Sequence, residues 1–208
     1  MVGQTLAGKL VTLGHEVTMG SRQPGNEKAV AWAAEAGDNA HDGTFADAAR
    51  FGEVVINATA GAASLDALEA AKAENLAGKV LIDVSNPLDF SKGQPPTLTV
   101  CNDDSVAEQI QRAYPDAKVV KTLNTVNAGL MVAPGSISQS HTVFVCGNDD
   151  DAKATVRELL ESFGWPTEDI LDLGDISGAR GTEMYLPLWL KLASATSSWM
   201  VNVKVVTP

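Results

Sequence analysis

The chain has 208 residues, of which 45% are hydrophobic and 20% charged, a composition that indicates one folded domain and excludes intrinsic disorder. Its 15 Lys and Arg stand against 26 Asp and Glu, and the net charge of −11 argues against partners such as nucleic acids or anionic membranes. The sequence carries no pattern of a signal peptide or a membrane span, so we expect a cytoplasmic protein.

Helices and short strands alternate along the first part of the chain. Apolar periodicity predicts helices over residues 3–13, 26–36, 44–50 and 65–73, and strands over residues 15–19, 54–56 and 79–83. We expect Gly14 to end the first of these helices and Ser64 to cap the last one.

The same alternation continues after a loop at residues 88–97. It predicts helices over 105–113 and 149–163, strands over 118–121, 142–146 and 169–173, and a helical region from 177 towards 203. A capping box of Ser105 and Glu108 is expected to open the helix at 105–113. Repeated strand–helix units predict an α/β fold with a doubly wound parallel sheet that is covered by helices on both faces.

The start of the chain matches only part of a dinucleotide-binding pattern. Such folds open with a strand and G-x-G-x-x-G, whose glycines let the backbone approach a pyrophosphate at a helix N-terminus. Here Gly3 stands in the place of the third glycine, directly before a helix, while the first strand and the first two glycines are absent. We expect the cofactor pyrophosphate to lie near Gly3.

Ser21 and Arg22 follow the strand predicted at residues 15–19, which corresponds to the second strand of a dinucleotide-binding fold. NAD-binding proteins place a carboxylate there for the ribose 2′-OH, whereas NADP-binding proteins place an Arg for the 2′-phosphate. No acidic residue occurs between Met19 and Asn26, and Lys28 adds a second cation nearby. These residues predict a site for the NADP 2′-phosphate, with a solvent-exposed turn as the alternative.

Three more strand ends carry small or neutral polar side chains that are expected to line the cofactor cleft. These are Ala58, Thr59, Asn86, Pro87, Asn124 and Thr125. The alternatives are a plain strand-to-helix turn for the first pair, a simple turn for the second pair, and an Asn cap of the next helix for Asn124.

In their order along the chain, these segments resemble the coenzyme F420-dependent NADP oxidoreductase family. The likeness rests on residues 2–7, 14–17, 20–22, 82–88, 120–126 and 172–180 with Glu183, and so covers nearly the whole chain. It implies a Rossmann-like NADP-binding domain over residues 1–147 and a small C-terminal helical part over residues 148–208 that closes over the cleft. It also implies hydride transfer between NADP(H) and a deazaflavin of the F420 type or a flavin-like acceptor. Such a transfer needs no protein nucleophile, and the sequence shows no catalytic triad and no metal-ligand spacing.

Because the first strand and the first two glycines of the pattern are absent, two other functions remain as alternatives. One is a catalytically degenerate nucleotide-binding module. The other is a Rossmann dehydrogenase acting on a small carbonyl substrate, for which Lys121 is the only nearby proton donor. Because the first strand is central to such a sheet, its loss leaves two neighbouring strands unpaired, and we expect about ten more residues ahead of Met1.

The large apolar residues of the C-terminal region are predicted to have a structural role and not a catalytic one. Trp189, Trp199 and Met200 are predicted to anchor the core or a subunit interface, and we expect a homodimer to form through this region. The resemblance implies that Arg180 and Glu183 are a structural or cleft-lining pair, whereas their spacing favours an ordinary i,i+3 ion pair on a helix surface.

Overall fold

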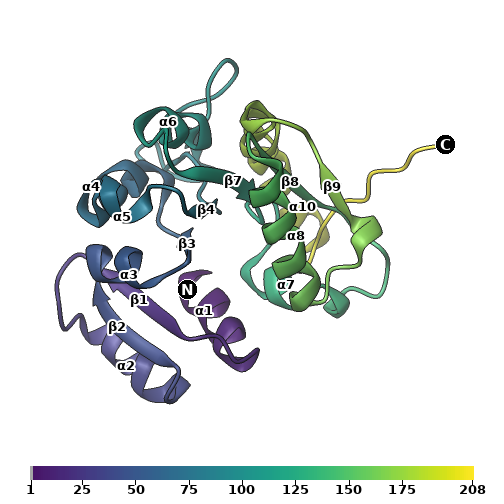
Figure 1. The fold of residues 1–208 in the computed structure, drawn as a ribbon. Coiled ribbons are helices and arrows are strands. Elements are labelled where there is room, and N and C mark those ends of the chain that lie inside the picture. The colour runs from purple at the N-terminus through teal and green to yellow at the C-terminus, as the bar shows by residue number, and fades with distance from the viewer. Residues whose placement is uncertain (1) are drawn as a thin grey trace.

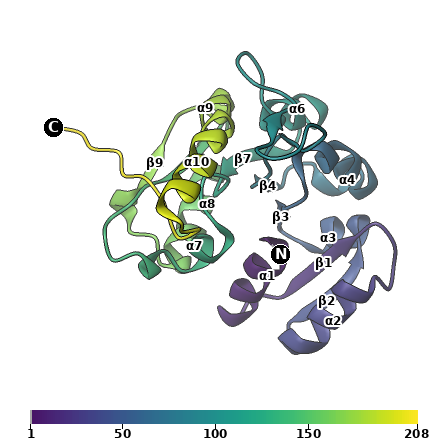
Figure 2. The same cartoon turned by 180° about the vertical axis from the view of Figure 1, so that it is seen from behind.

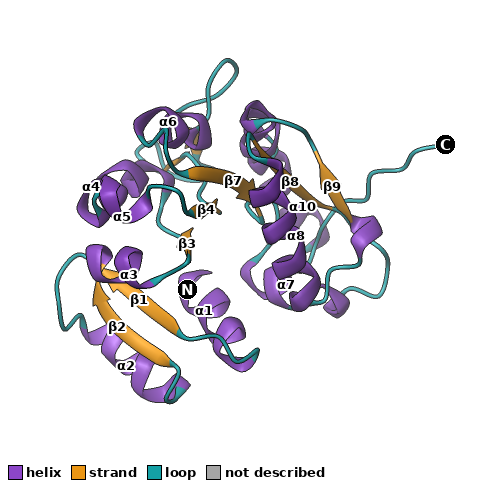
Figure 3. Cartoon of the chain, viewed as in Figure 1, coloured by secondary structure: helices purple, strands orange, loops and turns teal. Residues whose placement is uncertain are grey.

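The computed structural model describes residues 2–208 and shows a mostly parallel sheet that is interrupted once. β1 (Val17–Ser21) pairs in parallel with β2 (Ala40–Thr44), and these two strands form one part. The other part has five strands in the order β3-β4-β7-β8-β9. Helix α1 (Val2–Thr12) packs against both β1 and α7 (Ala128–Val132), close to the interruption (Figures 1 and 3).

The five-stranded part changes direction once. β3 (Val54–Asn57), β4 (Val80–Asp83) and β7 (Lys118–Thr122) are parallel neighbours, whereas β8 (Val143–Gly147) is antiparallel to β7. β9 (Ile170–Asp172) is parallel to β8 and extends the same sheet. A separate hairpin of β5 (Leu88–Asp89) and β6 (Thr97–Leu98) follows β4.

Helices cover both faces of the sheet, as the two opposite views show (Figures 1 and 2). Besides α1 and α7 they are α2 (Glu27–Ala36), α3 (Phe45–Phe51), α4 (Ser64–Ala71), α5 (Ala73–Leu76), α6 (Val106–Ala113), α8 (Asp150–Phe163), α9 (Ala179–Met184) and α10 (Leu186–Thr196).

The two faces of β4 and β7 pack into different apolar clusters, so both faces are covered by helices. Ile82 and Val120 pack into a cluster with residues of α1, α7 and α8, while their neighbours Leu81 and Val119 join a cluster with residues of α3 to α6. Successive residues of a strand point to opposite faces, so β4 and β7 are apolar on both sides. The α/β fold class predicted from the sequence is confirmed.

Some local predictions were wrong for identifiable reasons. β2 was not predicted, because its sequence Ala-His-Asp-Gly-Thr lacks β-branched apolar residues and only pairing with β1 makes it a strand. β8 was expected to be parallel and is antiparallel. The last helix was expected to run towards residue 203 but ends at Thr196, after which Ser197 takes a left-handed conformation with φ of 52°.

The chain after α10 is extended and ends away from the body (Figure 1). Trp189 is buried and its indole N–H donates to the Val201 carbonyl oxygen, so it is a core residue as expected. Trp199 and Met200 are exposed, and the homodimer through this region stays a prediction. Among residues 2–208, no helix combines the length and the apolar character that crossing a bilayer requires.

Candidate functional site

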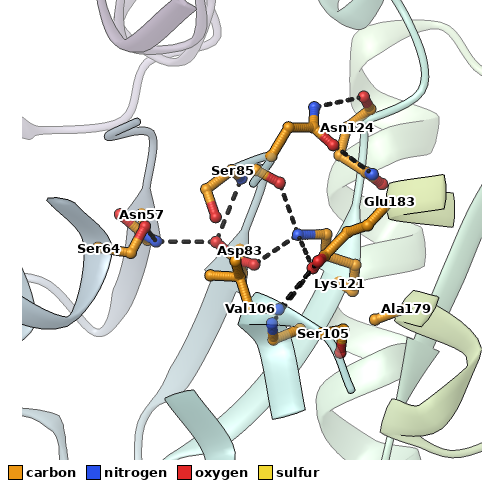
Figure 4. A network of polar contacts seen from close by, with 12 residues as sticks. Asn57, Ser64, Asp83, Ser85, Ser105, Val106, Lys121, Asn124, Ala179 and Glu183 are labelled. Carbon is orange, nitrogen blue, oxygen red and sulfur yellow. Dashed lines mark hydrogen bonds and ion pairs between the residues drawn. The ribbon is translucent and has the colours of Figure 1, made fainter. Parts of the chain in front are cut away.

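The carboxyl ends of β3, β4 and β7 bring three polar side chains into line. Asn57 lies opposite Asp83 in the register of β3 and β4, and Asp83 lies opposite Lys121 in that of β4 and β7. The Asn57 amide donates to Asp83 Oδ1 over 2.8 Å and to Ser64 Oγ over 2.9 Å (Figure 4). Ser64 was predicted as a helix cap, but it is the first residue of α4, follows the N-cap residue Ala63, and takes part in this network instead.

Lys121 is the centre of this network and is fully buried. Its Nζ donates to Asp83 Oδ2 over 2.7 Å, to the Ser85 carbonyl oxygen over 2.6 Å and to Glu183 Oε1 over 2.8 Å. Burial lowers the pKa of the Lys121 ammonium, but the two carboxylates outweigh burial and raise that pKa overall. The ammonium therefore stays charged and has no free donor direction towards the cleft.

Glu183 connects the network to the C-terminal region. Its carboxylate accepts the backbone N–H groups of Val106 and Ala107, the first residues of α6, over 2.9 and 3.2 Å. A carboxylate at a helix N-terminus is stabilised by the unpaired N–H groups there and by the helix dipole. One side chain of α9 thus ties α6 to the charged centre between β4 and β7.

The predicted ion pair between Arg180 and Glu183 is wrong. Arg180 instead donates from Nε to both oxygens of Glu108, over 3.0 and 2.9 Å, and its hydrogen bonds hold the pKa of that carboxyl below its usual range. Glu108 therefore completes only half of the predicted capping box. Ser105 Oγ accepts from the Glu108 N–H, while the Glu108 carboxylate accepts the Ser105 hydroxyl rather than its N–H.

Asn86 and Asn124 form a pair one step further towards the surface. The Asn86 amide donates to the Asn124 carbonyl oxygen over 2.8 Å, and the Asn124 amide donates to Asn86 Oδ1 over 3.0 Å. Asn127, not Asn124, caps α7, so the alternative role considered for Asn124 is wrong. Pro87 lies beside this pair, where its carbonyl oxygen accepts the Thr99 N–H of the hairpin.

Three buried oxygens beside this pair have no hydrogen-bond partner among residues 2–208. They are Ser85 Oγ, Asn124 Oδ1 and Thr125 Oγ1, at the carboxyl ends of β4 and β7. An unsatisfied buried polar atom costs about 1–3 kcal/mol, so several at one place point to a ligand that supplies their partners. Leu123, at the same strand end, has φ of 61°, a left-handed conformation that is rare for leucine and recurs at functional sites.

Gly3 brings the start of α1 to the same edge of the sheet. A Cβ atom at Gly3 would lie 3.6 Å from the Ala58 Cβ and 3.9 Å from the Met19 sulfur, so the helix begins beside the ends of β1 and β3. The first turn of α1 has no acidic residue, so no carboxylate of that turn offsets the positive end of the helix dipole. Thr59 follows Ala58, and its hydroxyl donates to Asn57 Oδ1 over 2.7 Å, which joins it to the polar network.

The predicted phosphate residues lie at the end of β1 and the start of α2. Ser21 Oγ donates to the Gln23 carbonyl oxygen over 2.6 Å and shapes the turn. Arg22 and Lys28 are exposed, and neither side chain forms an ion pair within residues 2–208. Two cations without counter-charges stand out in a chain of net charge −11.

The site residues predicted from the sequence thus fall into three groups along one edge of the sheet. Asn86 and Asn124 are in contact, Gly3 lies against Ala58, and Ser21, Arg22 and Lys28 lie around the next strand end. Sequence reasoning missed Asp83, Ser85 and the role of Glu183. The sequence did contain a signal for Asp83. It lies in one apolar strand and Lys121 lies in another, and opposite charges in buried strands each need a partner.

Comparison with known proteins identifies the family. A family model described as NADP oxidoreductase, coenzyme F420-dependent, matches residues 1–87. A crystal structure from Arthrobacter sp. FB24, provisionally assigned as an F420-dependent NADP reductase, is 53% identical with a TM-score of 0.93, and the match covers 99% of this chain and 95% of that one. The chain belongs to the F420-dependent NADP oxidoreductase family.

Two characterised relatives are more distant. The F420-dependent NADP reductase of Methanocaldococcus jannaschii is 32% identical over 148 residues, which make up 70% of this chain and 64% of that protein. The rat metalloreductase STEAP3 is 34% identical over 121 residues, which make up 56% of this chain but only 22% of that protein. This chain therefore spans less than two thirds of the length of either relative.

Replacing Lys121 with Met should destabilise the protein strongly. The Asp83 and Glu183 carboxylates would remain buried without a counter-charge, and removing one partner of such a pair costs about 3–5 kcal/mol. We expect this loss in the free energy of unfolding from urea titration at pH 7. Lys191→Met removes the same charge from an exposed position of α10 and should change stability by less than about 0.5 kcal/mol. Equal losses in both variants would contradict the importance of the buried network.

Proposed function

We propose that the protein is an NADP(H)-dependent oxidoreductase that transfers a hydride between NADP(H) and a deazaflavin of the F420 type or a flavin-like acceptor. The observation that carries the proposal is the group of three buried, unpartnered oxygens of Ser85, Asn124 and Thr125. They lie at the carboxyl ends of β4 and β7, where an open α/β sheet binds its ligand. Membership of the family gives that ligand its chemical class.

The residues present suit each part of NADP(H). Ser21, Arg22 and Lys28 offer a hydroxyl and two unpaired cations to the 2′-phosphate. The start of α1 around Gly3 offers backbone N–H groups to the pyrophosphate. The Asn124 oxygen can accept from a carboxamide NH₂, and the Ser85 and Thr125 hydroxyls can accept or donate.

The protein would supply position rather than a reactive group. NADPH supplies the hydride when it is bound. Asn86, Asn124 and Thr125, beside which the nicotinamide would lie, carry neutral amides and a hydroxyl. Paired side chains such as Asn86 and Asn124 are held by each other, so they keep their geometry without help from a ligand. Fixed orientation of two reactants lowers the barrier to their reaction by several kcal/mol, on the order of 7–11 in the best cases.

The structure weakens the case for a dehydrogenase of small carbonyl substrates. Such an enzyme needs a proton donor, and Lys121 was the only candidate near the cleft. Its side chain has no exposed surface and its donors are directed at Asp83, Glu183 and the Ser85 carbonyl oxygen. Lys121 is therefore a structural cation.

The function is tested by steady-state assays of NADPH oxidation with coenzyme F420, FMN, riboflavin and a panel of small aldehydes and ketones. We expect turnover with F420 or a flavin and none with the carbonyl compounds. Turnover with the carbonyl compounds alone would replace this proposal with the dehydrogenase. Tight NADPH binding by calorimetry without turnover on any acceptor would favour the degenerate nucleotide-binding module.

Arg22→Ala should weaken the binding of NADPH much more than the binding of NADH. Removing a charged hydrogen-bonding partner of the 2′-phosphate should weaken NADPH binding by about 10- to 100-fold, since such bonds contribute about 1.5–3 kcal/mol. Binding of NADH, which lacks that phosphate, should change by less than about threefold. Arg50→Ala removes the same charge at the far end of α3 and serves as the control in calorimetric titrations. An equal loss for both nucleotides would remove Arg22 from the site.

Thr125→Val should affect the cofactor but not the fold. The hydroxyl has no partner among residues 2–208, so its replacement by a methyl group should leave the free energy of unfolding unchanged or slightly raised. If the hydroxyl contacts NADP(H), kcat/KM should fall by about tenfold. Thr155→Val on the exposed face of α8 is the control. Unchanged kinetics in Thr125→Val would place the ligand elsewhere.

A further inference from the structure

Ser85 is held by its backbone, while its hydroxyl group is left without a partner. The Ser85 N–H donates to Asp83 Oδ1 over 3.2 Å, and the Ser85 carbonyl oxygen accepts from Lys121 Nζ over 2.6 Å (Figure 4). The Ser85 hydroxyl is buried and forms no hydrogen bond within residues 2–208. Two fully buried side chains, Asp83 and Lys121, therefore fix the position from which this hydroxyl can meet a ligand.

Lys121 can hold Ser85 only if its own ammonium group is fixed. The group donates to three oxygens, and two of them, Asp83 Oδ2 and the Ser85 carbonyl oxygen, belong to the end of β4 and the loop that follows it. The third is Glu183 Oε1 at 2.8 Å, which comes from α9 in the C-terminal region. An ammonium group with three acceptors has one orientation, whereas with two acceptors it can turn about them. Glu183 therefore completes the set of contacts that fixes the Lys121 ammonium.

The Glu183 carboxylate uses both of its oxygens. Oε1 accepts from Lys121 and from the Ala107 N–H, and Oε2 accepts from the Val106 N–H. An amide of the same shape has only one acceptor oxygen, and its NH₂ group would face either Lys121 or the Val106 N–H, donor against donor. Replacement of Glu183 by Gln must therefore break a contact on one of the two sides.

The effect of Glu183 extends to the paired amides of the site. Asn86 follows Ser85 in the chain, and its side chain forms two hydrogen bonds with Asn124. A shift of the Ser85 carbonyl group also turns the planar peptide bond that joins Ser85 to Asn86. The contacts thus lead from α9 through Lys121 to the side chains at the carboxyl ends of β4 and β7.

We propose that Glu183 is a positioning residue of the hydride-transfer reaction, an inference that rests on the proposed function. Glu183 would touch neither nucleotide nor acceptor, and it acts through Lys121 on Ser85, close to where the nicotinamide would lie. The phosphates of NADP(H) would bind elsewhere, near Gly3 and Arg22. Loss of the Glu183 carboxylate should therefore reduce the rate of hydride transfer much more than the affinity for the nucleotide.

The same contacts predict that a bound nucleotide affects the start of α6. A ligand that pairs with the Ser85 hydroxyl favours the arrangement in which Lys121 and Glu183 are also fixed, and coupling of this kind acts in both directions. The Val106 and Ala107 N–H groups donate to Glu183, so they are not free to bind the nucleotide themselves. NADPH should nevertheless slow their hydrogen exchange by about fivefold.

The test compares Glu183→Gln with Glu108→Gln in the full chain. Glu108 also joins α6 to α9, but its carboxylate accepts from Arg180 and Ser105 instead of Lys121. Both variants lose one negative charge at the same junction of helices. Stopped-flow oxidation of bound NADPH by coenzyme F420 or FMN should slow by about 10- to 100-fold in Glu183→Gln and by less than about threefold in Glu108→Gln. The Kd of NADPH, from calorimetric titration, should stay within about threefold in both variants.

Hydrogen exchange provides a readout that needs no turnover. In the chain without nucleotide, exchange of the Ser85 N–H relative to that of Leu160 should become about tenfold faster in Glu183→Gln. Leu160 is buried in α8, outside the network, and its amide corrects for any loss of global stability. The ratio should not change in Glu108→Gln. In the natural chain, which needs no variant to fold, NADPH should slow exchange at the first two residues of α6.

Four results would overturn the positioning role. They are equal slowing of hydride transfer in both variants, a loss in Glu183→Gln that appears in the Kd of NADPH and not in the rate, an unchanged exchange ratio at Ser85 in Glu183→Gln, and exchange at the start of α6 that NADPH does not affect. If Ser85 exchanges faster in Glu183→Gln while NADPH binds but is oxidised by no acceptor, the link from Glu183 to Ser85 stands and the proposed function fails.

Discussion

The ammonium group of Lys121 is the interaction on which the arrangement of the site depends. It forms ion pairs with both Asp83 and Glu183 in a fully buried position, and it also donates to the Ser85 carbonyl oxygen. Through these contacts one atom joins β7, the end of β4, and α9. A buried charge of this kind is weak support for stability by itself, but it tolerates few alternative arrangements, because any shift leaves a charge unpaired.

The polar layer above this cation takes its shape from the same contacts. Asp83 bridges Lys121 and Asn57, and Asn57 in turn orients Thr59 and Ser64. Asn86 and Asn124, which are hydrogen-bonded to each other, also belong to this polar layer. The unpartnered oxygens are therefore displayed by a rigid support, which is the condition for a binding site that is formed before its ligand arrives.

The general fold could be predicted because it follows from local patterns, and the same patterns put the predicted site residues at the carboxyl ends of strands. Apolar β-branched runs marked β3, β4 and β7, and ligands of α/β sheets bind at the carboxyl ends of such strands. β2 could not be predicted, because its exposed His41 and Asp42 carry no strand signal and pairing alone defines it. The partners of Arg180 and Glu183 were also out of reach, since Glu108 and Lys121 lie 72 and 62 residues away from them in sequence.

The reversed direction of β8 has a further consequence for the evolution of this protein. Because β8 starts at the edge where β7 ends, the chain from residue 123 to 142 stays at that edge and does not cross the sheet. Parallel neighbours would have required a crossover at this point. Insertions or deletions in this connection can reshape the wall next to Asn124 and Thr125 while every strand keeps its register. The shape of this wall can thus diverge among descendants of this fold without any change in the pairing of the strands.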